Sequence, residues 1–243
     1  MVPFIAVAVM LLAPALVSSQ SSKIEWFPEE MYNPQMEPRR CGLNSDEASY
    51  ICDPNGLTGE HIHSINWILR DAAYNSTRCP CSNYYCETYP RPLGYHIGVA
   101  LVKKMKIQTN LGGRRNSLED QGQLFANTLK DKWKMGRCEE NIIIFYSYDD
   151  RVLAIYGGRT AMAKLTPYYR SLLSYRVGSR FSEGHIVEAI NNLLYDLKTV
   201  LNCDSQFQDC GLLEMRSGVS TVGFSTSITV MAILLTVFHL FSI

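Results

Sequence analysis

Residues 142–156 have the sequence IIIFYSYDDRVLAIY, in which two apolar runs flank a short polar stretch. Both runs, 142–146 and 152–156, are rich in β-branched and aromatic residues, which favour β-strands. The polar stretch between them contains Asp149 and Asp150, and aspartate is common in tight turns. This segment therefore predicts two adjacent strands joined as a β-hairpin.

The segments on either side of the hairpin supply a further strand and three helices. Residues 95–102 (YHIGVALV) are apolar on both faces, which predicts a strand inside a covered sheet. Apolar residues at helical spacing predict a helix over 58–75 that begins at a Thr58 cap, a second helix after a capping box at 117–120, and a third over 182–201. The order helix, strand, helix, hairpin, helix predicts an α/β fold, a three-layer α/β/α sandwich with a small mixed sheet.

The segment before the first predicted helix has a different composition. Residues 20–57 are rich in Pro, Asn, Glu and Ser, and Asp53-Pro54-Asn55-Gly56 is a typical turn sequence. We therefore expect an irregular leader, clasped by its own cysteines, that lies outside the core. The globular domain is expected to span residues 58–210.

The chain contains eight cysteines, an even number that predicts disulfides in an oxidising compartment. The three between residues 79 and 86 are close enough in sequence for zinc to be an alternative, but no paired C-x-x-C motif accompanies them. We expect the local pairs Cys41–Cys52 and Cys203–Cys210, while the other four pair among themselves in an order that the spacing leaves open. The expected disulfide cysteines are Cys41, Cys52, Cys79, Cys81, Cys86, Cys138, Cys203 and Cys210.

Both ends of the chain carry apolar segments that indicate the secretory pathway. Residues 1–19 end in small residues after an apolar run, as signal peptides do, so we expect a mature chain that begins near Gln20. After a linker at 211–221, residues 222–243 contain no charged residue and are long enough for a transmembrane helix. No Lys or Arg follows Arg216, and the small residues Ser217 and Gly218 equally fit a GPI-attachment signal. Both alternatives place the domain on the extracellular face of the cell membrane.

Two further features concern the surface of the domain. Asn75-Ser76-Thr77 is an N-glycosylation triplet near the end of the first predicted helix, so Asn75 is a candidate glycan acceptor. The pairs Tyr84-Tyr85 and Tyr168-Tyr169 can serve partner contacts or pack internally, since tyrosine is favoured at interfaces. Equal numbers of basic and acidic residues, 23 of each, provide no net charge to attract nucleic acid.

The sequence contains none of the specific catalytic motifs. G-x-S-x-G, H-E-x-x-H, Walker A and G-x-G-x-x-G sequences are all absent, so we expect no catalytic residue and no cofactor. Asp149 and Asp150 form an acidic pair at a strand end, where carboxylates can bind calcium. Calcium requires about six oxygen ligands, and only Ser147 is a further local donor, so a plain turn is the favoured interpretation.

The chain resembles the extracellular domain of the modulator-of-levamisole-receptor family, a branch of the TPM fold. The resemblance covers Trp26 to about Leu201, and the order and spacing of its motifs are more specific than any one of them. The motifs are Met31-Tyr32-Asn33-Pro34, Cys41-Gly42, Ile51-Cys52-Asp53-Pro54, Gly94-Tyr95-His96-Ile97-Gly98-Val99-Ala100, Phe125-Ala126 with Trp133, and Gly136-Arg137-Cys138.

The resemblance implies an auxiliary protein that binds pentameric acetylcholine-gated channel subunits of the levamisole type and positively modulates their gating. Other TPM branches resemble calcium-dependent phosphatases, whose acidic loop would correspond to Asp149 and Asp150 in this sequence. The fuller acidic set of those enzymes is not evident here. A phosphatase, and a structural or adhesive surface domain, are therefore the alternative hypotheses.

Overall fold

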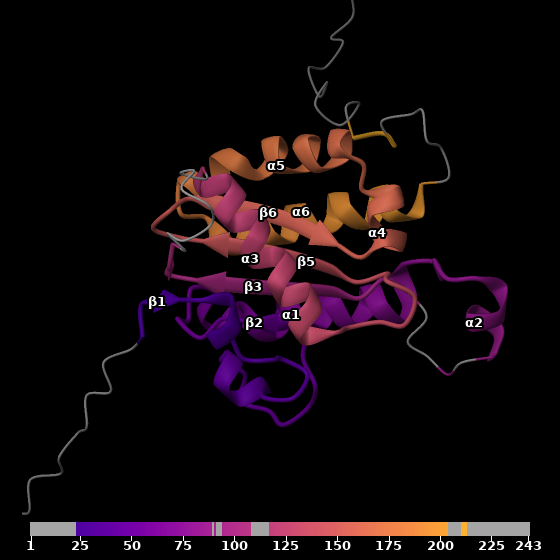
Figure 1. Ribbon diagram of the computed structural model, residues 1–243, viewed down its shortest axis with the longest axis horizontal. Helices are drawn as coiled ribbons and strands as arrows, with labels where there is room; N and C mark the ends of the chain where they lie inside the picture. Colours follow the sequence, from indigo (N-terminus) through magenta and orange to yellow (C-terminus); the bar gives the residue numbers. More distant parts are fainter. Residues whose placement is uncertain (1–22, 89, 91–93, 108–116, 204–209, 213–243) are drawn as a thin grey trace, which may run out of the picture.

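A computed structural model of the protein describes residues 23–88, 90, 94–107, 117–203 and 210–212 (Figure 1). The signal peptide expected at 1–19, the attachment residues Ser217 and Gly218, and the apolar segment 222–243 lie outside these residues. Within the described part of the chain, no helix has the length and apolar character needed to cross a bilayer.

The centre of the molecule is a four-stranded mixed sheet with strand order β2-β3-β5-β6. The first three strands in this order are parallel, and the last two form the antiparallel hairpin that the sequence predicted. A short parallel pair, β1 with β4, lies beside this sheet. The strand bounds are β1 Glu25–Trp26, β2 Ile51–Cys52, β3 Ile97–Val102, β4 Lys104–Met105, β5 Ile142–Ser147 and β6 Val152–Gly157.

Helices cover both faces of the sheet (Figure 1). Helix α3 packs on one face, while α6 lies on the other between α1 and α5. The bounds are α1 Ile62–Asp71, extended by a π-helical turn at Ala72–Ser76, then α2 Asn83–Thr88, α3 Leu118–Trp133, α4 Arg159–Lys164, α5 Pro167–Ser182 and α6 Ile186–Asn202.

Two neighbouring residues of β5 show the three layers directly. Successive side chains of a strand point to opposite faces of the sheet. Phe145 stacks on Phe125 of α3 with ring centroids 4.0 Å apart. Tyr146 points the other way, where its ring lies 4.2 Å from that of Phe181 in α5 and its hydroxyl donates to the Phe181 carbonyl at 3.0 Å. The described residues thus form the mixed α/β arrangement that the sequence predicted.

The prediction that the leader lies outside the core is wrong. Trp26, Met31 and Ile51 are buried, and β2 extends the sheet by pairing with Val99 and Ala100 of β3. Short 3-10 turns and two-residue strands provide no sequence periodicity, so the pattern alone indicates an irregular segment. The leader is instead fixed by the Cys41–Cys52 disulfide and by strand pairing.

Helix boundaries follow the predicted caps only in part. Ser117 accepts a hydrogen bond from the Asp120 N–H, which confirms the capping box of α3. Thr58 does stand at the N-cap of a 3-10 turn, Gly59–His61, that leads directly into α1 at Ile62. Its side chain does not cap that turn, because the Thr58 hydroxyl donates to the buried carboxylate of Asp53. The last helix begins at Ile186 rather than at 182, since residues up to Ser182 belong to α5.

The packing of α3 on the sheet provides a stability test. A Cβ atom at Gly122 would lie 2.4 Å from Cγ1 of Val152, so Gly122→Ala forces the helix and the strand apart and should destabilise the protein by about 1–3 kcal/mol. Gly178 of α5 is the matched control, because a Cβ there meets nothing within 4 Å. Gly178→Ala should stabilise by about 0.5–1 kcal/mol through helix propensity. Urea unfolding of both variants checks this, and equal effects would contradict the described packing.

Candidate functional site

The carboxyl ends of β2, β3 and β5 meet at one edge of the sheet, where open α/β sheets usually bind ligands. The turn after β5 contributes Tyr148, Asp149 and Arg151 to this edge, and the end of α5 faces them. Together these segments enclose a hollow of about 520 Å³. Its lining residues are Tyr148, Asp149, Arg151, Phe181, Ser182, Glu183 and Gly184.

The acidic side chains at this edge differ in what they contact. Asp150 accepts hydrogen bonds from the Met105 N–H at 2.9 Å and from the Ser147 hydroxyl, which ties the hairpin turn to β4. Asp53, after β2, accepts from the backbone N–H groups of Leu57 and Thr58 and from the Thr58 hydroxyl. Both carboxylates therefore fix local backbone structure.

Asp149 is exposed and faces the hollow, as the predicted calcium site would require. Among the described residues, however, no third His, Cys, Asp or Glu side chain joins Asp149 and Asp150 at metal-ligand distance. The group that does meet this criterion is Cys81, Cys138 and Glu140, and its two sulfur atoms are joined in a disulfide. The calcium prediction stays untested, and the surroundings of Asp150 favour the plain turn.

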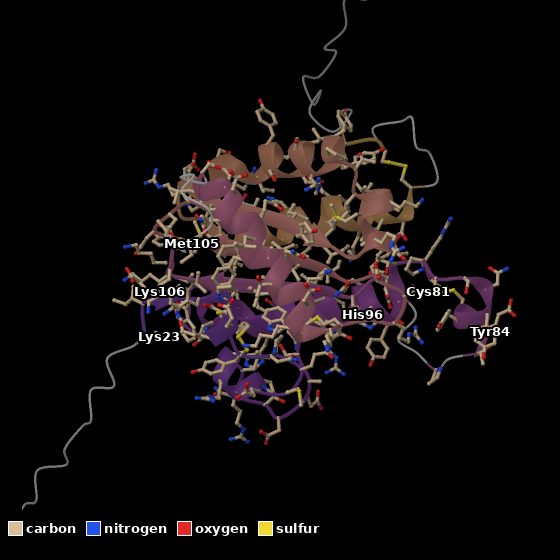
Figure 2. All side chains as sticks on the ribbon, viewed as in Figure 1. Lys23, Cys81, Tyr84, His96, Met105 and Lys106 are labelled. Carbon is tan, nitrogen blue, oxygen red and sulfur yellow. A yellow bond between two sulfur atoms is a disulfide. The ribbon has the colours of Figure 1, made fainter. Side chains whose placement is uncertain are left out.

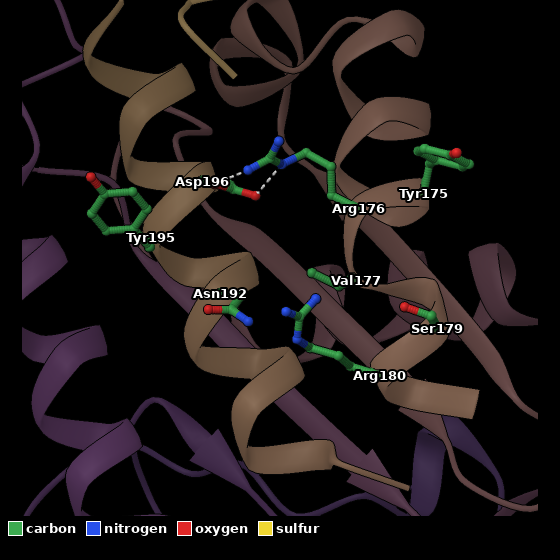
Figure 3. Close-up of a pocket in the computed structure, with 8 residues that line it drawn as sticks. All are labelled: Tyr175, Arg176, Val177, Ser179, Arg180, Asn192, Tyr195 and Asp196. Atoms are coloured by element: carbon green, nitrogen blue, oxygen red, sulfur yellow. Dashed lines mark hydrogen bonds and ion pairs between the residues drawn. The ribbon is translucent and has the colours of Figure 1, made fainter. Parts of the chain in front are cut away.

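A second hollow, of about 580 Å³, lies between α5 and α6 (Figure 3). Arg176 crosses it: Nε donates to Asp196 Oδ2 at 2.7 Å, Nη2 donates to Oδ1 at 3.3 Å, and Nη1 donates to the Leu212 carbonyl. The exposed rings of Tyr175 and Tyr195 lie on its two sides. The lining is Tyr175, Arg176, Val177, Ser179, Arg180, Asn192, Tyr195 and Asp196.

The sequence prediction missed α5 and, with it, both hollows. Two signals were present. Thr166-Pro167 has the N-cap and first-turn proline that often begin a helix, and the Thr166 hydroxyl does accept from the Tyr169 N–H. Tyr169, Leu173, Val177 and Phe181 then recur every four residues and are all buried. Exposed tyrosines and arginines between them obscured the apolar stripe.

All eight cysteines lie among the described residues and form four disulfides. Cys41 pairs with Cys52 and Cys203 with Cys210, which are the two local pairs expected from the sequence. The remaining bridges are Cys79–Cys86 and Cys81–Cys138. The second of these joins the segment after α1 to the segment before β5.

The amino edge of the sheet holds a buried acid beside the Cys81–Cys138 bridge. Glu140 is fully buried, and its carboxylate accepts from the N–H groups of Arg137 and Cys138 at 2.7–2.9 Å. His96 Nδ1 lies 3.4 Å from Glu140 Oε1. Burial alone would raise the pKa of Glu140, but the nearby His96 and these N–H groups outweigh it and lower the pKa to about 2.

The glycosylation triplet lies on the surface at the end of the π-helical turn. Asn75 is exposed, so its side chain is sterically open to modification. Thr77 of the same triplet is buried, where its hydroxyl donates to the Ala72 carbonyl at 2.6 Å and accepts from the Tyr95 N–H at 2.8 Å. The two triplet residues therefore have separable roles, one at the surface and one in the fold.

The described residues thus define a disulfide-bonded mixed α/β domain with hollows at the hairpin turn and between α5 and α6, in which Asp53 and Asp150 fix local backbone structure. The family model described as "Modulator of levamisole receptor-1" matches residues 23–151. The chain belongs to this family, as the sequence motifs predicted.

Comparison with individual proteins adds a distant structural likeness. No curated protein matches the chain. Among solved structures, the chain is similar to the N-terminal domain of a protein from P. gingivalis, determined by solution NMR in a structural genomics programme. The two share 16% sequence identity with a TM-score of 0.43, and the alignment covers 72% of this chain and 91% of that one.

The lowered pKa of Glu140 leads to a pH prediction. An unfolded Glu takes up a proton near its ordinary pKa of 4.5, whereas folded Glu140 does so only near 2. The stabilisation that ionised Glu140 gives to the folded protein is therefore complete above about pH 4.5 and is lost as the pH falls toward 2. Urea unfolding of Glu140→Gln should show lower stability at neutral pH and a shallower decline on acidification. Glu60→Gln, which removes an exposed carboxylate, should follow the wild-type profile, and an unchanged profile for Glu140→Gln contradicts the assignment.

Separating the two triplet residues gives a further prediction. Asn75→Gln should abolish a glycosidase-sensitive mobility shift without altering the melting temperature, because Asn75 is exposed. Thr77→Ala should abolish the shift and also destabilise the protein by about 1–3 kcal/mol, since it leaves the Tyr95 N–H without its acceptor. Thr77→Ser preserves the triplet and serves as the control. A wild-type chain from a secretory host with no such shift would count against glycosylation at Asn75.

Proposed function

We propose that this protein is an extracellular auxiliary protein, attached to the cell membrane, that binds pentameric acetylcholine-gated channels of the levamisole-sensitive type and increases their response. The main support for this proposal is the family match over residues 23–151. That region contains the leader, the strands β1 to β5, helices α1 to α3 and the hairpin turn.

The side-chain chemistry supports binding rather than hydrolysis. Asp53 and Asp150, the acids best placed at the carboxyl edge of the sheet, accept hydrogen bonds from backbone N–H groups and hydroxyls within the fold. Asp149 is the one acidic residue of the hairpin turn that faces the hollow. A calcium-dependent phosphatase therefore has less support than a binding protein, and no specific contact favours a purely adhesive role over channel binding.

Attachment is proposed through the segment that follows the described residues, and its support is the uncharged, apolar composition of residues 222–243. Leu212 is fully buried, its carbonyl accepts a hydrogen bond from Arg176, and Cys210 is bonded to Cys203, the residue directly after α6. These contacts fix the point from which residues 213–243 continue. In the proposal, that continuation attaches the domain either as a spanning helix or through a GPI anchor at Ser217 or Gly218. Release from cells by a phosphatidylinositol-specific phospholipase distinguishes the lipid anchor from the helix.

Co-expression with channel subunits tests the proposal. Agonist-evoked current per surface channel should rise when the protein is present, because a bound auxiliary protein shifts the gating equilibrium only if it binds the open state more tightly. Surface labelling of the channel in the same cells separates altered gating from altered channel number. An unchanged current with the protein demonstrably at the surface contradicts the proposed function for that channel. Recovery of other surface proteins, but no channel, would favour the adhesive alternative.

A further inference from the structure

One part of the molecule is held rigidly although it adds nothing to the core. Residues 79–88, which we name the stapled knob, include helix α2 and project from the body of the domain (Figure 1). Tyr84 and Cys81 lie in this projection, away from the sheet (Figure 2). None of the six described residues of α2 is buried.

Two of the four disulfides hold this short segment. Cys79–Cys86 closes the knob on itself across seven positions. Cys81–Cys138 fastens it to the segment that leads into β5, 57 positions along the chain. The knob therefore has a closed loop of its own and a covalent link to the central sheet.

Hydrogen bonds fix the base of the knob on both sides. On one side, the Arg78 N–H donates to Asn202 Oδ1 at 3.1 Å, and the amide nitrogen of Asn202 donates to the Ser76 carbonyl at 2.8 Å. On the other, Arg137 Nη1 donates to the Pro90 carbonyl at 3.4 Å. The direction in which the knob points is therefore set by α6 and by the Gly136–Cys138 turn.

The rigidity of the knob has no explanation in core stability. A six-residue helix is far too short to be stable in isolation, and none of the residues of this one is fully buried. The disulfides stabilise the segment instead, because they restrict the conformations that the unfolded chain can adopt. A surface segment that is ordered in advance loses less conformational entropy when it binds, so its ordering favours recognition.

The exposed chemistry of the knob favours a protein partner. Tyr84 is 64% exposed, and its ring meets that of Tyr85 edge-on at a centroid distance of 5.7 Å. Tyrosine provides a large amphipathic contact area at low entropic cost and is enriched among the residues that dominate interfaces. Glu87 is the only charged residue from 79 to 88, and its negative charge disfavours nucleic acid and anionic lipid surfaces.

We propose that the stapled knob is the element of this protein that enters a partner, inserting Tyr84 and Tyr85 into a concave, uncharged or basic protein surface. A projecting element can be buried only by a partner surface that is hollowed to receive it. The inference rests on the proposed function, under which the partner is the extracellular part of the acetylcholine-gated channel. The hollows at the hairpin turn and between α5 and α6 are then not the principal contacts.

The test compares two double tyrosine-to-alanine variants, one in the knob and one on the surface of α5 and α6. Tyr84→Ala/Tyr85→Ala removes the knob rings, and Tyr175→Ala/Tyr195→Ala removes rings that are 68% and 57% exposed on α5 and α6. Each full-length protein is co-expressed with the channel and recovered by pull-down of the channel from the cell surface. The knob variant should bind at least about tenfold more weakly, as loss of central interface tyrosines commonly causes. The α5–α6 variant should bind as the wild type does.

A third variant tests the ordering of the knob separately from its rings. Cys79→Ser/Cys86→Ser leaves both tyrosines and the Cys81–Cys138 bridge in place. It should keep the wild-type melting temperature within a few degrees, because α2 buries no residue, and yet bind the channel several-fold more weakly. Equal binding by this variant would overturn the role of preorganisation.

The outcomes separate the inference from the function on which it rests. If the wild type binds the channel and the knob variant binds equally well, the inference is wrong while the proposed function stands. If the wild type itself neither binds nor alters the channel, the proposed function fails. The knob variant is also compared with the wild type on vesicles of phosphatidylcholine and phosphatidylserine. If replacing the two tyrosines weakens binding to these vesicles and leaves binding to the channel unchanged, the partner is a membrane surface and the inference is overturned.

Discussion

The parallel pairing of β3 with β5 is the interaction on which the rest of this structure depends. The two strands pair over six residues, from Ile97 with Ile142 to Val102 with Ser147, and every residue of both is buried. Strands buried on both faces require a helical layer on each side, and here α3 covers one face while α6 and its neighbours cover the other. Because the strands are parallel, the same pairing also separates the molecule into an amino edge and a carboxyl edge.

The two edges carry different chemistry. At the carboxyl edge, Asp53 and Asp150 accept hydrogen bonds from nearby backbone, so the position that often binds ligands in such folds is used to fix turns. At the amino edge, the Glu140 carboxylate occupies the turn before β5, where the positive φ of Gly136 and its missing Cβ leave room for the carboxylate. The Cys81–Cys138 bridge links that turn to the stapled knob.

Prediction from sequence succeeded where local pattern and tertiary packing agree. The two strands of the hairpin 142–156 are each a continuous apolar run, and the capping box at Ser117 is a purely local signal, so both are present as expected. The leader could not be predicted in this way, because two-residue strands and 3-10 turns have no period and take their order from Cys41–Cys52 and from pairing with β3. Helix α5 was hidden by exposed tyrosines and arginines, and α2 has no apolar stripe at all. Of the candidate site residues, Asp149 lines a hollow that the sequence did not predict, and the role of Asp150 depends on β4, which no local pattern places beside it.

The central claim is that this domain acts by binding, through its stapled knob, to a channel at the cell surface. Hydrogen–deuterium exchange of the full-length protein, measured with and without the channel in a membrane, tests this claim most directly. The account predicts slower exchange over residues 79–88 in the presence of the channel, with no change at the hairpin turn 148–151 or across the α5–α6 hollow. Slower exchange confined to the hairpin turn and to the connection between α5 and α6, with the knob unaffected, would contradict it.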